Sequence, residues 1–129
     1  MRPITLPHQP PVRCLTGAAE ILADGLRVTA SVAVDSPGAD GGVVRPGWLI
    51  EVAAQACAAC AGVGSDGVVR TGVLAGLKTW SWSGTVAIDA IMLVTVQRGA
   101  SLGALSEYQC RITVGDRPIA AGTLVVALQ

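Results

Sequence analysis

The chain has 129 residues, the size of one ordinary domain, and we expect a single domain over residues 1–129. Of these residues 51% are hydrophobic and 14% are charged, and the formal net charge at pH 7 is zero, so a large core is available. A neutral chain lacks the basic patch that nucleic-acid binding needs, which excludes a nucleic-acid partner. The N-terminus has no apolar segment of signal-peptide length and the most apolar helix is too short to span a bilayer, so we expect a cytoplasmic protein with no membrane partner.

The first part of the chain is predicted to form a β-hairpin followed by a loop. Apolar and polar residues alternate over 26–34, with Leu26, Val28, Ala30, Val32 and Val34 on one face, which predicts a half-buried strand. The turn residues at 23–25 join it to a first strand over 14–22. Glycine and proline pairs then indicate a loop over 35–44.

A helix is predicted over residues 46–61, and nearly all of its surface is small and apolar, so it should be buried almost all round. Its polar side chains, Glu51 and Gln55, lie four residues apart and therefore share one helix face. Burying a carboxylate is costly unless it is paired, hydrogen-bonded or protonated, which favours a functional role for Glu51. The alternative is a partly solvated carboxylate in the first helical turn, stabilised there by the helix dipole.

Four further strands are predicted over 68–83, 90–98, 102–114 and 119–128. Lys78, Trp80 and Trp82 alternate in the first of these strands and are expected to share one face, whereas the last strand is apolar on both faces and is expected inside the sheet. A wholly apolar helix with about six antiparallel strands is packed best when the sheet curls around the helix. We therefore expect an α+β chain with the hotdog fold, an antiparallel sheet curled around one central helix.

The cysteines are Cys14, Cys57, Cys60 and Cys110, and two of them form a Cys-x-x-Cys on the helix. A redox motif of this kind belongs at a helix start beside a strand, and a zinc site needs two more ligands. We expect buried, reduced cysteines that act as small hydrophobic residues, with no metal site and no cofactor.

Four short motifs occur in order along the chain: Leu6-Pro7-His8, Pro10-Pro11, Pro46-Gly47-Trp48 and Glu51-x-x-x-Gln55. Together they resemble motifs of hotdog-fold 3-hydroxyacyl-acyl-carrier-protein dehydratases, and more closely those of the small dehydratase-like proteins found with aryl polyene biosynthesis. The resemblance implies a substrate that is an acyl thioester on an acyl carrier protein or coenzyme A. The loop over 35–44 lacks the Gly-His-Phe-Pro motif whose histidine is catalytic in the better-known dehydratases, and Leu15-Thr16-Gly17 stands where an Asp-Arg pair is usual.

Dehydration of a 3-hydroxyacyl thioester needs a base, an acid and donors for the carbonyl oxygen. Glu51 is the candidate acid. His8 is the only imidazole in the chain and hence the candidate base, the alternative being an exposed histidine in a proline-rich arm. Gln55 is expected either to orient Glu51 or bind across to another subunit, or to be a structural amide that satisfies backbone groups.

The start of the helix is a candidate substrate-binding element, together with Gln55. Arg45 is a poor N-cap residue, so the amides near Gly47 and Trp48 are expected to be free for a thioester carbonyl. The alternative is that an acidic or hydroxyl side chain from the 35–44 loop folds back and caps them.

The resemblance thus implies a 3-hydroxyacyl-thioester dehydratase of fatty acid or polyene biosynthesis. One alternative is an acyl thioesterase in which Glu51 is the base or nucleophile. Another is a non-catalytic acyl-binding protein or a partner subunit of a catalytic homologue. Because an open sheet leaves an edge that pairing would cover, we expect a homodimer or larger homo-oligomer. The resemblance implies an active site between subunits, so that Glu51 and His8 are allowed to come from different chains.

Overall fold

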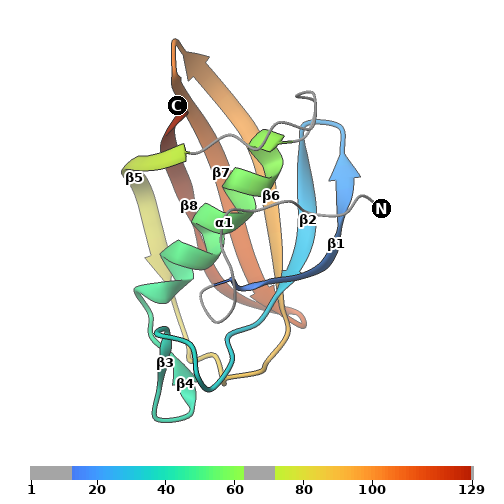
Figure 1. Cartoon of the computed structure of the whole chain (residues 1–129), viewed down its shortest axis with the longest axis vertical. Helices are drawn as coiled ribbons and strands as arrows, with labels where there is room; N and C mark the ends of the chain where they lie inside the picture. The colour runs from blue at the N-terminus through green and yellow to red at the C-terminus, as the bar shows by residue number, and fades with distance from the viewer. Residues whose placement is uncertain (1–12, 63–71, 129) are drawn as a thin grey trace.

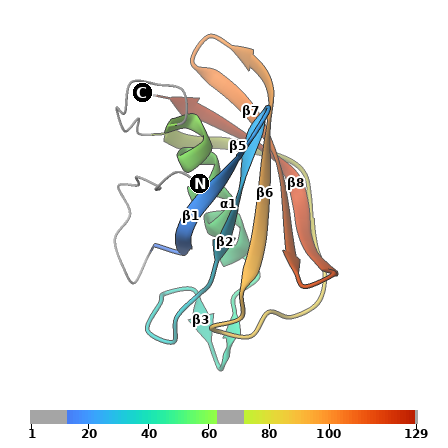
Figure 2. The ribbon, with the colours of Figure 1, turned by 90° about the vertical axis from the view of Figure 1, so that its right-hand side faces the viewer.

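The computed structural model describes residues 13–62 and 72–128. One six-stranded antiparallel sheet, in the order β1-β2-β6-β7-β8-β5, curves around a single helix, and a two-stranded β3-β4 hairpin lies beyond the helix start (Figures 1 and 2). The hotdog fold expected from the sequence is confirmed by this arrangement. The elements are β1 Leu15–Leu22, β2 Gly25–Ala30, β3 Ala39–Asp40, β4 Val43–Val44, α1 Trp48–Gly62, β5 Gly72–Trp82, β6 Met92–Leu102, β7 Leu105–Val114 and β8 Arg117–Leu128.

The helix α1 is enclosed as its composition predicts. None of its residues is fully exposed, and Val52, Ala53 and Ala56 have no exposed surface. Small side chains let the helix approach the sheet closely, where it packs mainly on β6, β7, β2 and β8. Arg98 donates to the Cys60 carbonyl at 2.9 Å and so satisfies one of the acceptors at the helix end. Within residues 13–62 and 72–128, no helix has both the length and the apolar character needed to cross a membrane.

Several strand boundaries differ from the expected ones, although the alternation is mostly confirmed. Leu26, Val28 and Ala30 face the core, but β2 ends at Ala30 and Val34 is 73% exposed. Within the expected loop, β3 and β4 form a short hairpin. β8 lies inside the sheet between β7 and β5, as predicted. The turn expected at 63–67 and the first residues of the 68–83 strand lie outside the described residues.

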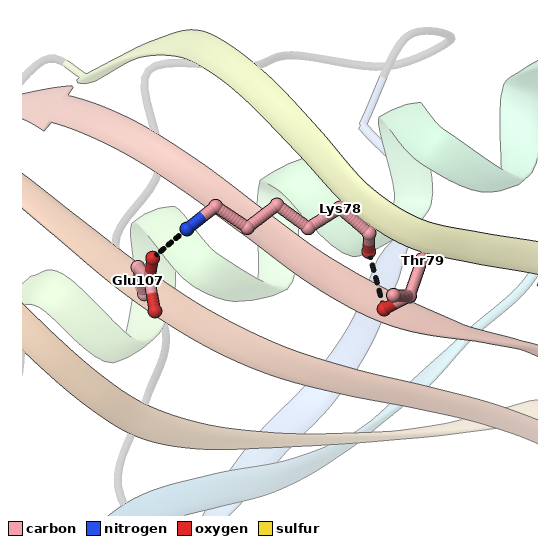
Figure 3. A network of polar contacts seen from close by, with 3 residues as sticks. All are labelled: Lys78, Thr79 and Glu107. Carbon is pink, nitrogen blue, oxygen red and sulfur yellow. Dashed lines mark hydrogen bonds and ion pairs between the residues drawn. The ribbon is translucent and has the colours of Figure 1, made fainter.

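The expectation that Lys78, Trp80 and Trp82 share one face is wrong, because β5 contains a β-bulge. The register with β8 shifts between Lys78 and Ser81, and Thr79 has a φ of 52°. Figure 3 shows the consequence: the Lys78 amine reaches Glu107 on β7, on the outer face of the sheet. Trp80 packs against the core instead. The extra residue therefore interrupts the alternation that the sequence suggested.

β5 is an edge strand whose apolar side chains are not covered by the described part of the chain. Val73, Leu74 and Leu77 are 49%, 39% and 40% exposed, and Trp82 is 55% exposed. The indole N–H of Trp80 is buried and has no hydrogen-bond partner among the described residues. A long apolar edge strand is a surface that other chains pair with.

The cysteines are free and buried, as the sequence predicts, and Cys57 contacts Cys110 on β7. The two sulfurs are 3.3 Å apart. The hydrogen bond with Cys110, followed by burial, raises the pKa of Cys57 well above its ordinary value, and burial raises the pKa of Cys60. These thiols therefore remain protonated in the folded chain at neutral pH, and we expect them to be unreactive.

We expect the free energy of unfolding to fall as the pH rises above about 8.5, the pKa of an unfolded cysteine. The raised pKa values keep the folded thiols protonated while the unfolded thiols ionise, so the unfolded state binds fewer protons and gains stability at alkaline pH. Urea unfolding at pH 7 and pH 9.5 measures the effect, and Cys57→Ala should weaken it. Equal free energies of unfolding at the two pH values would contradict the prediction.

Candidate functional site

A chain of polar contacts joins the start of α1 to the residue that precedes β1. The backbone N–H of Cys14 donates to Gln55 Oε1 at 2.7 Å. Gln55 Nε2 in turn donates to Glu51 Oε1 at 3.1 Å. The indole N–H of Trp48 donates to the Cys14 sulfur at 3.3 Å. We call Cys14, Trp48, Glu51 and Gln55 the helix-start network; it brings together three site residues expected from the sequence and one, Cys14, that was not.

The two polar side chains on α1 differ in burial. Gln55 has no exposed surface, whereas Glu51, one turn earlier, is only partly buried. Glu51 lies in the first helical turn, where the helix dipole stabilises its negative charge. The partly solvated position weighed as an alternative from the sequence is therefore the observed one. Glu51 remains accessible to a reacting molecule, and Gln55 contacts only protein.

Cys14 is nearly fully enclosed, and its thiol lies close enough to Glu51 to feel its charge. Burial raises the pKa of the Cys14 thiol, the hydrogen bond from Trp48 lowers it in part, and the Glu51 carboxylate raises it. The thiol is therefore protonated at neutral pH, and its sulfur acts as an acceptor for the indole N–H. No sequence motif marks Cys14, because its role arises from a contact 41 residues along the chain.

The loop that contains β3 fixes the position of the Trp48 ring. A Cβ atom on Gly38 would lie 2.2 Å from the Trp48 ring, so the loop backbone lies directly against the indole. Ser36, which is buried, accepts a hydrogen bond from the Gly38 amide at 3.1 Å and closes this turn. The close packing holds the indole N–H toward Cys14.

The expectation of free amides at the helix start is wrong for Trp48. Its amide donates to the Arg45 carbonyl at 2.9 Å, and the next two amides donate to Pro46 and Gly47 at 3.2 Å. A tight turn of backbone carbonyls thus satisfies these donors, and none of the three needs a side-chain cap. Gly47 itself is exposed, with open space within 4 Å of the position a Cβ would occupy.

These contacts test neither the role of His8 nor the expected absence of a metal site. His8, the candidate base, lies outside the described residues. Among residues 13–62 and 72–128, no cluster of His, Cys, Asp or Glu side chains is arranged to hold a metal ion. The chemistry available in the described part of the site is that of an accessible carboxyl group, a buried amide and a backbone helix start.

A curved antiparallel sheet around one enclosed helix, with a carboxylate at the helix start, defines a hotdog-fold protein with a candidate acid–base site. The family model for ApeP-like proteins, described as ApeP dehydratase, matches residues 4–129, so the chain belongs to the ApeP-like dehydratase family. The resemblance stated from the sequence motifs is confirmed by this match. No curated protein matches the chain.

Solved structures show the same fold at low sequence identity. The dehydratase heterocomplex ApeI:P from Xenorhabdus doucetiae matches with a TM-score of 0.83 and 16% identity, over 96% of this chain and 88% of that one. A hypothetical thioesterase protein with coenzyme A from Streptococcus pneumoniae TIGR4 matches with a TM-score of 0.62 and 17% identity, over 86% and 84%. A mutant of the thioesterase PA1618 from Pseudomonas aeruginosa matches with a TM-score of 0.64 and 16% identity, over 86% of this chain and 79% of that one.

Proposed function

We propose that the protein is a 3-hydroxyacyl-thioester dehydratase that acts on an acyl chain carried by an acyl carrier protein or coenzyme A. The observation that supports the proposal most strongly is the position of Glu51, an accessible carboxyl group whose Oε1 accepts a hydrogen bond from buried Gln55. Membership of the ApeP-like dehydratase family supports the reaction class.

The reaction removes water from the 3-hydroxyacyl group and leaves a 2-enoyl thioester. A base takes a proton from the carbon next to the thioester carbonyl, and Glu51 gives its proton to the departing hydroxyl, which leaves as water. Negative charge grows on the carbonyl oxygen as the proton is lost, and the exposed Gly47 amide is the donor proposed to stabilise it. Both N–H groups of Trp48 donate hydrogen bonds within the chain, so we propose that Trp48 contacts the substrate through its ring.

His8 is the proposed base, because no other side chain in the sequence titrates near neutral pH without perturbation. In a homo-oligomer the imidazole would come from the same chain or from a neighbouring one. The role of His8 is tested with the His8→Ala variant.

The test is an assay of the purified protein with 3-hydroxyacyl thioesters on coenzyme A and on an acyl carrier protein, which follows enoyl absorbance and free thiol in the same sample. Enoyl formation without thiol release supports the dehydratase. Thiol release without enoyl formation overturns it in favour of the thioesterase, the activity named for two of the structural neighbours.

A second candidate function is that of a non-catalytic partner subunit that completes a homologous dehydratase. Its support is the likeness to a chain of a dehydratase heterocomplex, together with a loop over 35–44 that contains no histidine. If this candidate is correct, the protein alone gives neither product. Activity then appears only after a hotdog chain that has a histidine in that loop is added.

We expect the protein to self-associate through β5. This strand is a sheet edge with exposed apolar side chains, and pairing with a second chain would cover them. Leu77→Lys places a charge on this edge and should shift a dimer to monomers in light scattering at micromolar concentration. Leu102→Lys is the control, because Leu102 is 82% exposed at the end of β6, away from β5, and should leave the mass unchanged. A wild-type monomer at that concentration would contradict the prediction.

A further inference from the structure

We propose that the outer face of the sheet contains a second binding site, which is centred on Arg111 and takes a small carboxylate that also has hydroxyl groups. The outer face is the one turned away from α1, so the sheet separates this site from Glu51 (Figure 2). The site and its ligand are independent of the proposed dehydratase activity.

A hollow of about 420 Å³ lies on the outer face over β6, β7, β8 and β5, and its volume is in the range of small-molecule sites. The side chains that line it are mostly polar, and no large apolar side chain is among them. Such a lining favours a ligand with several hydrogen-bonding groups over an apolar one. The polar lining residues are Thr79, Thr95, Gln97, Gln109, Arg111 and Thr123.

Strand register places most of these side chains side by side. Val96 and Ile112, which alternate with them along β6 and β7, have no exposed surface, so their neighbours in the chain face outward. Side chains that are opposite each other on paired strands share one face and lie close together. Two such rows cross β6, β7 and β8 in the hollow: Thr95–Arg111–Ala121 and Gln97–Gln109–Thr123.

The hollow exists because β8 has small residues where β5 bulges. Ala121 and Gly122 offer nothing larger than a methyl group, and two residues of β5, Thr79 and Trp80, stand opposite Gly122 alone. A Cβ on Gly122 would lie 2.8 Å from the Trp80 Cα, so the backbone of the bulge lies directly against Gly122. Trp80 packs toward the core, whereas Thr79 lines the hollow (Figure 3). The bulge thus adds a hydroxyl group to the site.

Arg111 is the charged residue that lines the hollow, and it is exposed. Two other cations of the outer face are already paired, Lys78 with Glu107 and Arg27 with Glu20. Within residues 13–62 and 72–128, nothing forms an ion pair or a hydrogen bond with the guanidinium of Arg111. A guanidinium fits a carboxylate with two parallel hydrogen bonds, so Arg111 is available for a carboxylate ligand.

The charge around the hollow distinguishes a carboxylate from a doubly charged anion. One available guanidinium balances one negative charge, and the carboxylate of Glu107, two residues from Gln109 on β7, disfavours a second. The side chains of Gln97 and Gln109 form no hydrogen bonds within the described part of the chain, so both are available to ligand hydroxyl groups. A small hydroxy acid or sugar acid is therefore the ligand class that fits.

The test titrates the full-length protein with D-gluconate at constant ionic strength and follows backbone amide signals by NMR. We expect saturable shifts around Arg111 on β6, β7 and β8, with a dissociation constant of about 1 mM. Sorbitol, which has the hydroxyl groups but no carboxylate, should bind at least about tenfold more weakly. The proposal is overturned if gluconate shows no saturable binding, or if sorbitol or inorganic phosphate binds as tightly.

Arg111→Gln should raise the dissociation constant for gluconate about tenfold or more, because the paired hydrogen bonds and the charge are lost together. Arg27→Gln is the matched control, since it removes the same charge from the same face but from a residue that is bonded to Glu20 at 3.1 Å. Its effect should stay within about twofold. Equal effects of the two variants would show that only the overall charge of the face matters, which overturns the site.

Ala121→Leu fills the hollow and leaves Arg111 in place. Ala121 is exposed, so we expect the Tm to change little while gluconate affinity falls about tenfold or more. Light scattering of the same variants tests the other occupant of this face, a second copy of the chain. If the variants lower the mass of the assembly and leave gluconate binding unchanged, the face is a contact between copies and the proposal fails. None of these measurements depends on enoyl formation.

Discussion

Glu51→Gln is expected to lower the turnover of 3-hydroxyacyl-thioester dehydration by about a hundredfold or more, the scale of a lost general acid. The substitution keeps the size of the side chain, and its carbonyl oxygen still accepts the hydrogen bond from Gln55. The ionisable proton is the group that is removed. Thermal unfolding should therefore change little while kcat falls, and enoyl absorbance under saturating substrate measures the effect.

His8→Ala separates the mechanisms that remain after that result. A comparable loss of turnover indicates an acid–base pair of Glu51 and His8. A negligible loss leaves Glu51 acting without His8, as in a thioesterase or a composite site with a partner subunit. If Glu51→Gln itself retains full turnover, Glu51 is not the acid and the proposed mechanism fails.

Gly25→Ala is expected to destabilise the fold by about 3 kcal/mol or more, in the upper range for single substitutions. A Cβ at this position would lie 1.8 Å from the Val96 carbonyl oxygen on the neighbouring strand. The obstacle is backbone within the β2–β6 pairing, in which Gly25 is opposite Gln97, so neither strand is able to yield without losing ladder hydrogen bonds. Urea unfolding gives the change in the free energy of unfolding.

Gly76→Ala is the matched control for Gly25→Ala, because it is also a strand glycine. A Cβ on Gly76 would lie 4.0 Å from Val125, which is ordinary van der Waals contact. We expect its effect to stay within about 0.5 kcal/mol. Equal effects of the two alanine substitutions would show that the crowding at Val96 is relieved at little cost and would contradict the prediction.

The relation between the two polar residues of α1 was predictable from the sequence because helix geometry is local. Residues four apart share a face in any α-helix, and the contact between Gln55 and Glu51 follows from that spacing. The same is true of the alternation in β2 and β7, which places Leu26 and Ile112 in the core, and of the doubly apolar β8. The fold class and the choice of Glu51 as the candidate acid were therefore predictable from the sequence.

The rest of the site depends on contacts between separate elements, and no periodic pattern of residues in the sequence predicts such contacts. Cys14 reaches Gln55 across 41 residues, and Gly38 packs on Trp48 only because the β3–β4 loop folds back over the helix start. The bulge at Thr79 shifts the register of β5 and separates Lys78 from Trp80.

The sequence by itself determined one enclosed helix, six antiparallel strands and the Glu51–Gln55 pair, because each depends on the spacing of residues within one element. The tertiary structure alone decided which backbone group faces Gln55, and with it the direction of the hydrogen bonds that end at Glu51. That choice depends on how the curved sheet brings the residue before β1 to the helix, and sheet curvature is a property of all the strands together.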